Sequence, residues 1–160
     1  MEDLLSKEPV KRVLKALSDF DESLKVETLI SSARTAKDAS ESLKTEVGSI
    51  VKSLLLRRKS SFLLCLVAGD KRCSLNKIKK LLNEKDVSMA NADQVKEITG
   101  FTIGGVSPVA HSSSLEILID NSLNRFPFVF AAAGHPNCVF KITYEKLIKI
   151  TKGSEKEISE

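Results

Sequence analysis

The stretch Ile50–Ala68, IVKSLLLRRKSSFLLCLVA, decides the fold of this chain. It contains two apolar runs of strand length, 50–57 and 62–68, on either side of the short basic segment RKSS. Apolar runs of this length separated by a few polar residues are typical of adjacent strands joined by a turn. The stretch therefore predicts a pair of neighbouring strands that carries much of the apolar core.

Short helices and strands are predicted outward from this hairpin. Helices are expected after the capping residues Ser6, Thr35, Ser74 and Asn91 and from near Thr143. Further strands are expected over 24–30, 87–90, 115–119, 128–132 and 139–142, with 101–103 forming a strand-like approach to a glycine pair. Short strands with interspersed helices predict an α+β domain around a mixed, curved sheet.

Composition limits the possible classes of protein. A chain of 160 residues with 42% hydrophobic residues predicts one globular domain over 1–160, with a core at about 25–150 and a polar, frayed tail at 151–160. The net charge of +4 allows a nucleic-acid partner without requiring one. Three cysteines without CxxC spacing indicate reduced thiols inside a cell. With no signal peptide and no apolar run of spanning length, we expect a soluble, cytoplasmic protein without a membrane partner.

Lys52 is the most unusual residue of the hairpin. Alternation places it on the face of Leu54 and Leu56, while Val51 and Leu55 point the other way. An ammonium group buried among such side chains is costly unless it meets an anionic group. Lys52 therefore either projects into a cavity that receives a ligand or extends its amine to water at a sheet edge.

The segment FTIGGVSPVAH (101–111) contains a second candidate site. Paired glycines allow positive φ and a close approach of a ligand to the backbone, and successive amides can bind an oxyanion. A plain turn is the alternative reading of the same dipeptide. His135, in AAAGHPNC, ends a small-residue strand, where an imidazole either contacts a ligand or lies in a surface turn.

Common catalytic signatures are absent from the sequence. It has no GxSxG, HExxH, Walker or GxGxxG motif, and two histidines with scattered cysteines do not predict a metal site. We expect neither a metal nor another cofactor. An enzyme with this sequence would work without an evident protein base or nucleophile.

Three motifs in order, SIVKSLLL, GGVSPVAH and AAAGHP, resemble the YbaK and prolyl-tRNA-synthetase-associated editing domains over about residues 25–150. The segments ARTAKDAS and TGFTIGGVSP resemble the free-standing members. The resemblance implies an α+β domain with a mixed, barrel-like sheet flanked by helices. It also implies hydrolysis of wrongly charged aminoacyl-tRNA.

The resemblance also implies roles for individual residues. Lys52 matches the lysine that helps to hold the charged 3′ end of the tRNA, and Gly104 and Gly105 match the loop whose backbone binds near the ester carbonyl. The substrate-binding residues that it implies are Thr35, Ser53, Val106, Ser107, Pro108, Ala133, Gly134 and His135. Ala110 departs from the family, which often has glycine at this point, and alanine restricts positive φ.

From the resemblance we expect a trans-editing deacylase acting on tRNA for proline that carries alanine, cysteine or serine. An aminoacyl ester is already activated, so the backbone amides and a substrate hydroxyl could replace a catalytic triad. Prolyl-tRNA synthetase or an elongation factor is the expected further partner, and DNA is not. A non-catalytic module that binds aminoacyl-tRNA or a synthetase is one alternative, and a hydrolase using Cys138 or Ser107 is another.

Basic residues could contact tRNA phosphates outside the cavity, or could simply form a solvated surface. They are Arg57, Arg58, Lys59, Lys77, Lys79 and Lys80.

Overall fold

The computed structural model describes residues 3–31 and 34–160. In these ranges the α-helices are α1 (Glu8–Phe20), α2 (Ala36–Leu43), α3 (Leu75–Leu82), α4 (Ala92–Thr99) and α5 (Tyr144–Thr151). The strands are β1 (Val26–Thr28), β2 (Val51–Arg58), β3 (Ser61–Ala68), β4 (Val87–Met89), β5 (Glu116–Asp120), β6 (Val129–His135), β7 (Cys138–Ile142) and β8 (Ser154–Lys156). Short 3-10 helices cover Leu4–Ser6, Val47–Ser49 and Asn121–Arg125.

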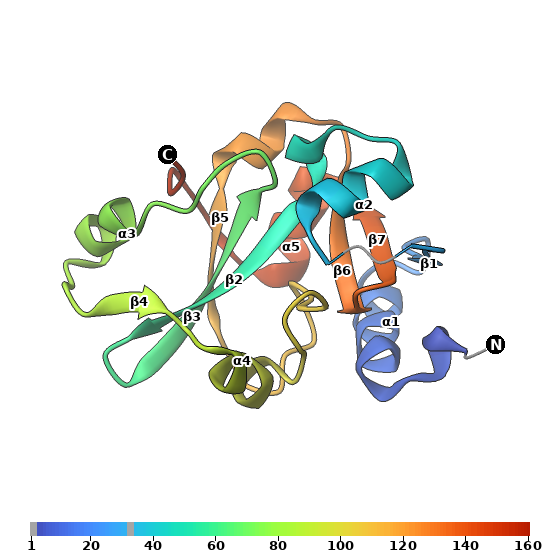
Figure 1. The fold of residues 1–160 in the computed structure, drawn as a ribbon, viewed down its shortest axis with the longest axis horizontal. Helices are drawn as coiled ribbons and strands as arrows, with labels where there is room; N and C mark the ends of the chain where they lie inside the picture. The colour runs from blue at the N-terminus through green and yellow to red at the C-terminus, as the bar shows by residue number, and fades with distance from the viewer. Residues whose placement is uncertain (1–2, 32–33) are drawn as a thin grey trace.

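The strands form two sheets (Figure 1). The larger has the order β4-β2-β3-β5-β8 and the smaller the order β1-β7-β6. The predicted hairpin is present, with β2 antiparallel to β3, whereas β5 runs parallel to β3. A bridge between Ile50 and Phe130 connects the two sheets. The α+β class and the mixed sheet are confirmed, but the strands form two sheets and do not close into a barrel.

Side-chain capping fixes where most of the helices begin. The hydroxyl or amide oxygens of Thr35, Ser74, Asn91 and Thr143 each accept a hydrogen bond from the amide three residues further on. Such bonds satisfy amides that have no partner within the helix. The predicted caps are thus confirmed, except that α1 begins after Lys7 and not after Ser6. In the described ranges, no helix is long and apolar enough to cross a membrane.

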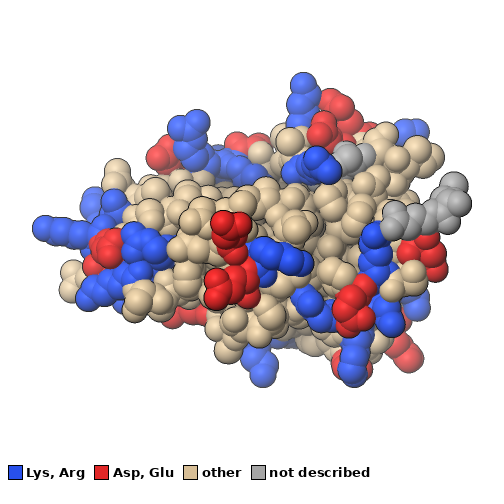
Figure 2. All heavy atoms as spheres, turned by 60° about the horizontal axis from the view of Figure 1, so that its bottom comes forward, with Lys and Arg blue, Asp and Glu red and all other residues tan. Residues whose placement is uncertain are grey.

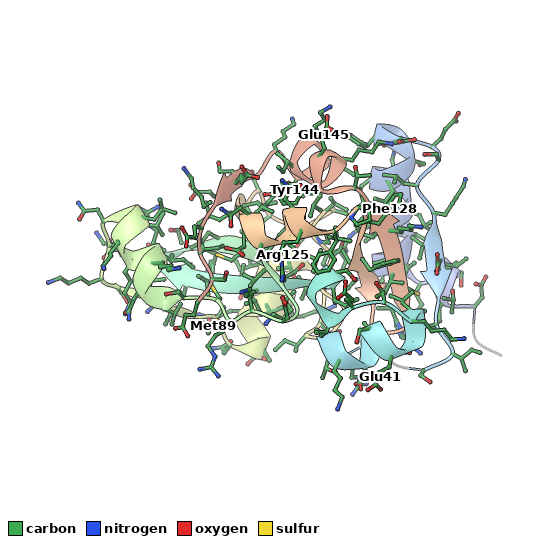
Figure 3. All side chains as sticks on the ribbon, turned by 90° about the horizontal axis from the view of Figure 1, so that it is seen from above. Glu41, Met89, Arg125, Phe128, Tyr144 and Glu145 are labelled. Atoms are coloured by element: carbon green, nitrogen blue, oxygen red, sulfur yellow. The ribbon has the colours of Figure 1, made fainter. Side chains whose placement is uncertain are left out.

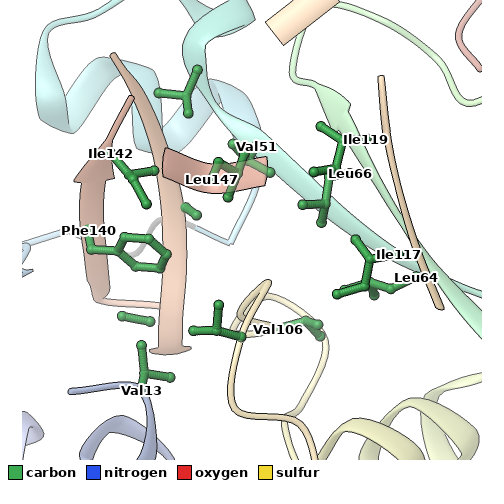
Figure 4. Close-up of a cluster of buried hydrophobic side chains, with 14 of the residues drawn as sticks. Val13, Val51, Leu64, Leu66, Val106, Ile117, Ile119, Phe140, Ile142 and Leu147 are labelled. Atoms are coloured by element: carbon green, nitrogen blue, oxygen red, sulfur yellow. The ribbon is translucent and has the colours of Figure 1, made fainter. Parts of the chain in front are cut away.

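The hydrophobic core lies between the sheets and the helices that cover them (Figure 4). Val51 and Leu55 belong to the larger cluster, whereas Leu56 belongs to a smaller one under α3. This division confirms the alternation predicted for β2. Val106, from the glycine loop, is also part of the larger cluster. The core therefore fixes the glycine loop against the sheets.

The residues before the glycine pair do not form the expected strand. Gly100, at φ 81°, ends α4, and the hydroxyl of Thr99 accepts a hydrogen bond from the Phe101 amide at 3.0 Å. The amide of Gly105 then donates to the carbonyl of Thr102 at 2.9 Å. The chain turns twice within six residues, which leaves no room for an extended segment.

The C-terminal segment is ordered, contrary to the expectation of a frayed tail. β8 pairs in parallel with β5, and Ile158 is fully buried in the smaller cluster. The hydroxyl of Tyr144 (labelled in Figure 3) donates to the Glu155 carboxylate at 2.5 Å. Asp120 binds the segment further on, because its carboxylate accepts from the Ile158 amide at 2.8 Å and from the Ser159 hydroxyl at 2.9 Å.

Replacing Asp120 with alanine is expected to lower the free energy of unfolding by about 3 kcal/mol, since buried donors lose a charged acceptor. Burial acts to raise the pKa of Asp120, but hydrogen bonds from Ser122, Ile158 and Ser159 outweigh it and lower the pKa. The contribution is therefore present above the pKa of an unfolded aspartate and is lost as pH falls through the lowered folded pKa. Urea denaturation at pH 7 and pH 3 measures both effects. Asp19→Ala, at an exposed ion pair, is the control and should change stability by under about 0.5 kcal/mol.

Candidate functional site

A cavity of about 390 Å³ lies where β2, the start of α2, the glycine loop and the β6–β7 pair meet. Most of its wall is apolar, and polar groups come from a few residues of β2 and α2. Met89 is one of the residues that line the cavity. Figure 3 shows Met89 and Glu41 of α2 on the side of the molecule away from Tyr144 and Glu145 of α5. Five of the residues implied by the family resemblance line it: Thr35, Lys52, Ser53, Gly104 and Val106.

Lys52 lies between this cavity and a second, more open hollow. The second hollow is lined by Lys52, Leu54 and Met89, which it shares with the first, and by residues 69–73 and Leu75. The ammonium of Lys52 donates a hydrogen bond to the carbonyl of Lys71. Burial lowers the pKa of Lys52, while the nearby Cys73 and Asp70 act to raise it. Lys52 is thus a half-buried cation that lines the cavity without extending freely into water.

Ser53 carries a hydroxyl in the wall of the cavity. It follows the alternation of Val51 and Leu55, on the strand face opposite to that of Lys52. Its hydroxyl is buried and has no hydrogen-bond partner among the described residues. A buried hydroxyl without a partner costs free energy, and this oxygen would reach a ligand in the cavity only after a shift of the wall around it.

The two glycines of the loop are not equivalent. Gly104, at φ 94°, lines the cavity, and within residues 3–31 and 34–160 no hydrogen bond engages its amide or that of Val106. The amide of Gly105 instead closes the turn onto Thr102, and Gly105 does not line the cavity. Of the three amides expected to bind an oxyanion, Gly104 and Val106 are available, whereas that of Gly105 is not.

Gly105 has a packing role. A Cβ atom at this position would lie 3.0 Å from the backbone nitrogen and Cα of His135 and 3.2 Å from the carbonyl carbon of Gly134. Backbone atoms of β6 do not move as a side chain does. Glycine is therefore required here for the loop to lie against the end of β6.

The wall formed by β6 differs from the implied one. Ala131 and Ala132 line the cavity, whereas Ala133, Gly134 and His135 do not. The register between β6 and β7 shifts between Ala132 and His135, and Gly134 has φ 92°. Such an irregularity reverses the direction of the side chains that follow it. His135 is held in the turn, where its Nδ1 accepts a hydrogen bond from the Asn137 amide at 3.0 Å.

Ser107 and Pro108 do not line the cavity either. Ser107 is fully buried, and its hydroxyl accepts from the Val109 amide at 3.2 Å. Its carbonyl accepts a hydrogen bond at 2.7 Å from Nε2 of His111, which therefore carries a proton on that nitrogen. Burial lowers the pKa of His111. Ser107 and His111 therefore stabilise the loop on the side that does not line the cavity.

Ala110 adopts the left-handed conformation that favours glycine, with φ 66°. A glycine would adopt this conformation without strain, whereas a residue with a Cβ atom adopts it at a cost of about 1 kcal/mol.

Ala110→Gly is expected to raise the melting temperature by about 2 °C, since relief of this conformation outweighs the greater entropy of glycine in the unfolded chain. Differential scanning calorimetry measures the change. Ala16→Gly, inside α1, should have the opposite effect, and a lower melting temperature for Ala110→Gly would contradict the prediction.

Several residues of the cavity were not predicted. Arg34, directly before the cap of α2, lines the cavity, and its Cγ would lie 3.3 Å from a Cβ atom on Gly104. Ile103 and Met89, at least half exposed, also lie on the wall. Only the resemblance of the segment ARTAKDAS to the family pointed to the region of the sequence that contains Arg34. Nothing in the pattern around Met89 distinguishes it from a core residue.

Cys138 and the other thiols do not form a metal site with neighbouring side chains. Cys138 lines the cavity, and burial raises the pKa of its thiol. Over the described ranges, no group of three or more His, Cys, Asp and Glu residues is arranged to hold a metal ion. A protonated thiol is a weak nucleophile, so Cys138 is not activated for attack.

The expected basic surface is partly neutralised. Lys and Arg side chains gather at the end of the molecule formed by α3 and the β2–β3 turn, with acidic side chains among them (Figure 2). Three of the six predicted residues form ion pairs: Arg57 with Asp86 at 2.6 Å, Lys59 with Glu84 at 3.1 Å and Lys77 with Glu157 at 3.3 Å. Contact of these three with phosphates would compete with the existing pairs.

Comparison with known proteins identifies relatives of this arrangement. The sequence model of the aminoacyl-tRNA editing domain family matches residues 30–150. The protein YwhH of Bacillus subtilis is 32% identical over 72% of this chain and 74% of its own length. A proline–tRNA ligase of Kosmotoga olearia is 34% identical over 54% of this chain but only 15% of its own length, so the chain spans a small part of that enzyme. A solved structure described as a candidate trans-editing enzyme for prolyl tRNA synthetase is 37% identical, with a TM-score of 0.90 over 96% of this chain and 98% of that one.

Proposed function

Because the chain belongs to the aminoacyl-tRNA editing domain family, we propose that it hydrolyses the ester of wrongly charged tRNA as a separate, trans-acting deacylase. The proposed substrate is tRNA for proline that carries alanine, cysteine or serine. The similarity to the candidate trans-editing enzyme and to proline–tRNA ligases supports this choice of tRNA. The proposed setting is the cytoplasm, where charged tRNA is made and used.

One observation carries the proposal: a single small cavity is lined by Lys52, Ser53 and Gly104. Lys52 brings a half-buried cation, Ser53 a buried hydroxyl without a partner among the described residues, and Gly104 a backbone amide. At about 390 Å³ the cavity is near the lower end of the range for small-molecule sites. A small aminoacyl group fits such a space, and the polar groups would fix its orientation.

The proposed reaction needs no covalent intermediate. A water oxygen forms a bond to the ester carbonyl carbon, and the carbonyl oxygen becomes an oxyanion. The amides of Gly104 and Val106, which no hydrogen bond among the described residues engages, would donate to that oxygen, as preorganised donors do in other acyl-transfer enzymes. The bond from carbon to the ribose oxygen then breaks, and the proton from water passes to this oxygen, which leaves free tRNA and amino acid.

The positive charge on Lys52 would hold the 3′ end of the tRNA beside the cavity. An ammonium attracts a phosphate or a carbonyl oxygen, and Arg34 supplies a second cation on the same wall. In the bound state the Lys52 ammonium can keep one hydrogen bond to Lys71 and still donate two others. Prolyl-tRNA synthetase or an elongation factor is the proposed source of the substrate.

The side chains give little support to a cysteine or serine hydrolase. The hydroxyl of Ser107 is fully buried and bound within the loop, and the thiol of Cys138 has a raised pKa. A covalent nucleophile needs an adjacent base that activates it. His135 is the histidine closest in sequence to Cys138, and its Nδ1 already accepts a hydrogen bond from the Asn137 amide.

The test is a panel of proline tRNAs charged with alanine, cysteine, serine or proline and labelled in the amino acid. We expect purified protein to release at least one of the small wrong amino acids faster than proline under single-turnover conditions. Loss of the labelled ester over time, corrected for the rate without protein, is the measurement.

Two other outcomes are informative. Tight binding of the charged tRNA with no ester loss would identify a non-catalytic binding module instead. Hydrolysis that disappears in Cys138→Ala, with the fold preserved, would revive the cysteine hydrolase.

A further inference from the structure

A pair of thiols lies beside the second hollow, outside the proposed reaction site. Cys73 lies between β3 and α3, directly before Ser74, the cap of α3. It is half-buried and lines the second hollow, as does Lys52. Its backbone also forms a bridge to Ser159 in the ordered C-terminal segment. Cys73 is therefore a free thiol that is held in place and accessible from solvent.

The second thiol belongs to Cys65, in β3. Cys65 is fully buried, and Cys73 packs against the small apolar cluster of which it is part. The two thiols are near enough to each other for a hydrogen bond between them to act on the pKa of both. Two thiols in contact can form a disulfide if one of them is first activated.

The charges around the pair distinguish the two sulfur atoms. The hydrogen bond from Cys65 lowers the pKa of Cys73, and Lys52 also lowers it, against the opposing effects of burial, Asp120 and Glu160. The amides at the start of α3 add positive potential next to Cys73. The same hydrogen bond and burial raise the pKa of Cys65. Cys73 is thus the more acidic of the two thiols, and Cys65 is the one that holds its proton more strongly.

We propose that Cys73 is a peroxide-reactive modification site and that Cys65 is its resolving thiol. The thiolate of Cys73 attacks one oxygen of a hydroperoxide, the O–O bond breaks, and Cys73 becomes a sulfenic acid while the other oxygen leaves as hydroxide or alkoxide. Cys65 sulfur then bonds to Cys73 sulfur, and the hydroxyl of the sulfenic acid leaves as water with the proton of Cys65. The net change is two thiols and one hydroperoxide to one disulfide, one water and one alcohol or second water.

Cys138 is the matched control within the same chain. It is also free and lines a cavity, but it is fully buried in β7 and burial raises the pKa of its thiol. Lys52 and the start of α2 line the cavity of Cys138 too, but the groups that shift the pKa of Cys138 are burial and Thr28, without a second thiol. A reaction that depends only on the presence of a thiol near a cavity would not distinguish the two.

The first experiment uses the unaltered, fully reduced chain and iodoacetamide. Peptide mass spectrometry follows the alkylation of each cysteine with time, and we expect Cys73 to react at least about tenfold faster than Cys138. As pH rises, the alkylation rate of Cys73 should reach its plateau at a lower pH than that of Cys138. Equal rates, or faster reaction of Cys138, would overturn the proposal. This measurement requires no variant and so does not depend on one folding.

The second experiment treats the reduced chain with hydrogen peroxide. We expect the intact mass to fall by about 2 Da and a peptide linked through Cys65 and Cys73 to form. In Cys65→Ser, Cys73 should instead accumulate a sulfenic acid that dimedone captures, and Cys138→Ser should oxidise as the unaltered chain does. Oxidation confined to Cys138, or no linked peptide in the unaltered chain, would refute the pairing. None of these readouts uses tRNA, so they are independent of the proposed deacylation.

Discussion

Lys52→Ala is expected to lower kcat/KM for the proposed deacylation of mischarged tRNA by about 100-fold or more and to leave the protein folded. Loss of one charged donor to a transition state typically has this effect. The residue is half-buried on the wall of the cavity, so its removal also leaves space that water can fill. Single-turnover rates measure the loss, and circular dichroism checks the fold. Lys149→Ala, exposed on α5, is the control and should keep the rate within about twofold.

The pH dependence separates a charged role of Lys52 from a steric one. Because burial lowers its pKa from the usual 10.5, the Lys52-dependent rate should fall as pH rises through that lowered value. Lys52→Arg keeps its charge over the whole accessible range and should lose this alkaline decline, even if it is slower overall. An alkaline decline shared by both proteins would assign the titration to another group, and a fully active Lys52→Ala would remove Lys52 from the mechanism.

Gly105→Ala is expected to lower kcat by about tenfold, although Gly105 does not line the cavity. Its new Cβ atom would lie 3.0 Å from the His135 backbone, so the loop must move away from β6 by a few tenths of an ångström. Gly104 and Val106 move with it, and because a misplacement of about 1 Å costs about 100-fold in rate, a shift of this smaller size costs about tenfold. The measurement is kcat for the substrate that the panel identifies.

The control for this substitution is Gly153→Ala, before β8. Its Cβ atom would contact the flexible end of the Ile119 side chain. Neither Gly153 nor Ile119 lines the cavity. We expect a modest loss of stability and an unchanged kcat. Equal effects of the two substitutions on kcat would show that the contact of Gly105 with β6 has no special role.

Local features of the fold were predictable because local residues determine them. The β2–β3 hairpin follows from two apolar runs, and Thr35, Ser74 and Asn91 begin their helices by bonds to amides three residues away. The C-terminal segment was not predictable in the same way. Its burial depends on Asp120, whose carboxylate binds Ile158 across 38 residues of sequence. No pattern within 151–160 indicates that partner.

The site was predictable to a similar extent. Lys52 was distinguished by a charge within an apolar strand, and Gly104 by a paired glycine. Ala133, Gly134 and His135 lie beyond the part of β6 that lines the cavity, and the irregularity between Ala132 and His135 cannot be read from a run of alanines. Arg34 lies in a polar segment without periodicity, so only the folded chain brings it to Gly104.

The pairing of β8 with β5 has a practical consequence for anyone who shortens this protein. β5 carries the consecutive apolar residues Ile117, Leu118 and Ile119, and β8 occupies the hydrogen-bonding groups along its outer side. A version that stops at Thr151 would present those groups and side chains to other molecules, and bare strands of this kind recruit further copies. The last nine residues, although mostly polar, thus cover the edge of β5. Their removal is expected to cause the protein to aggregate.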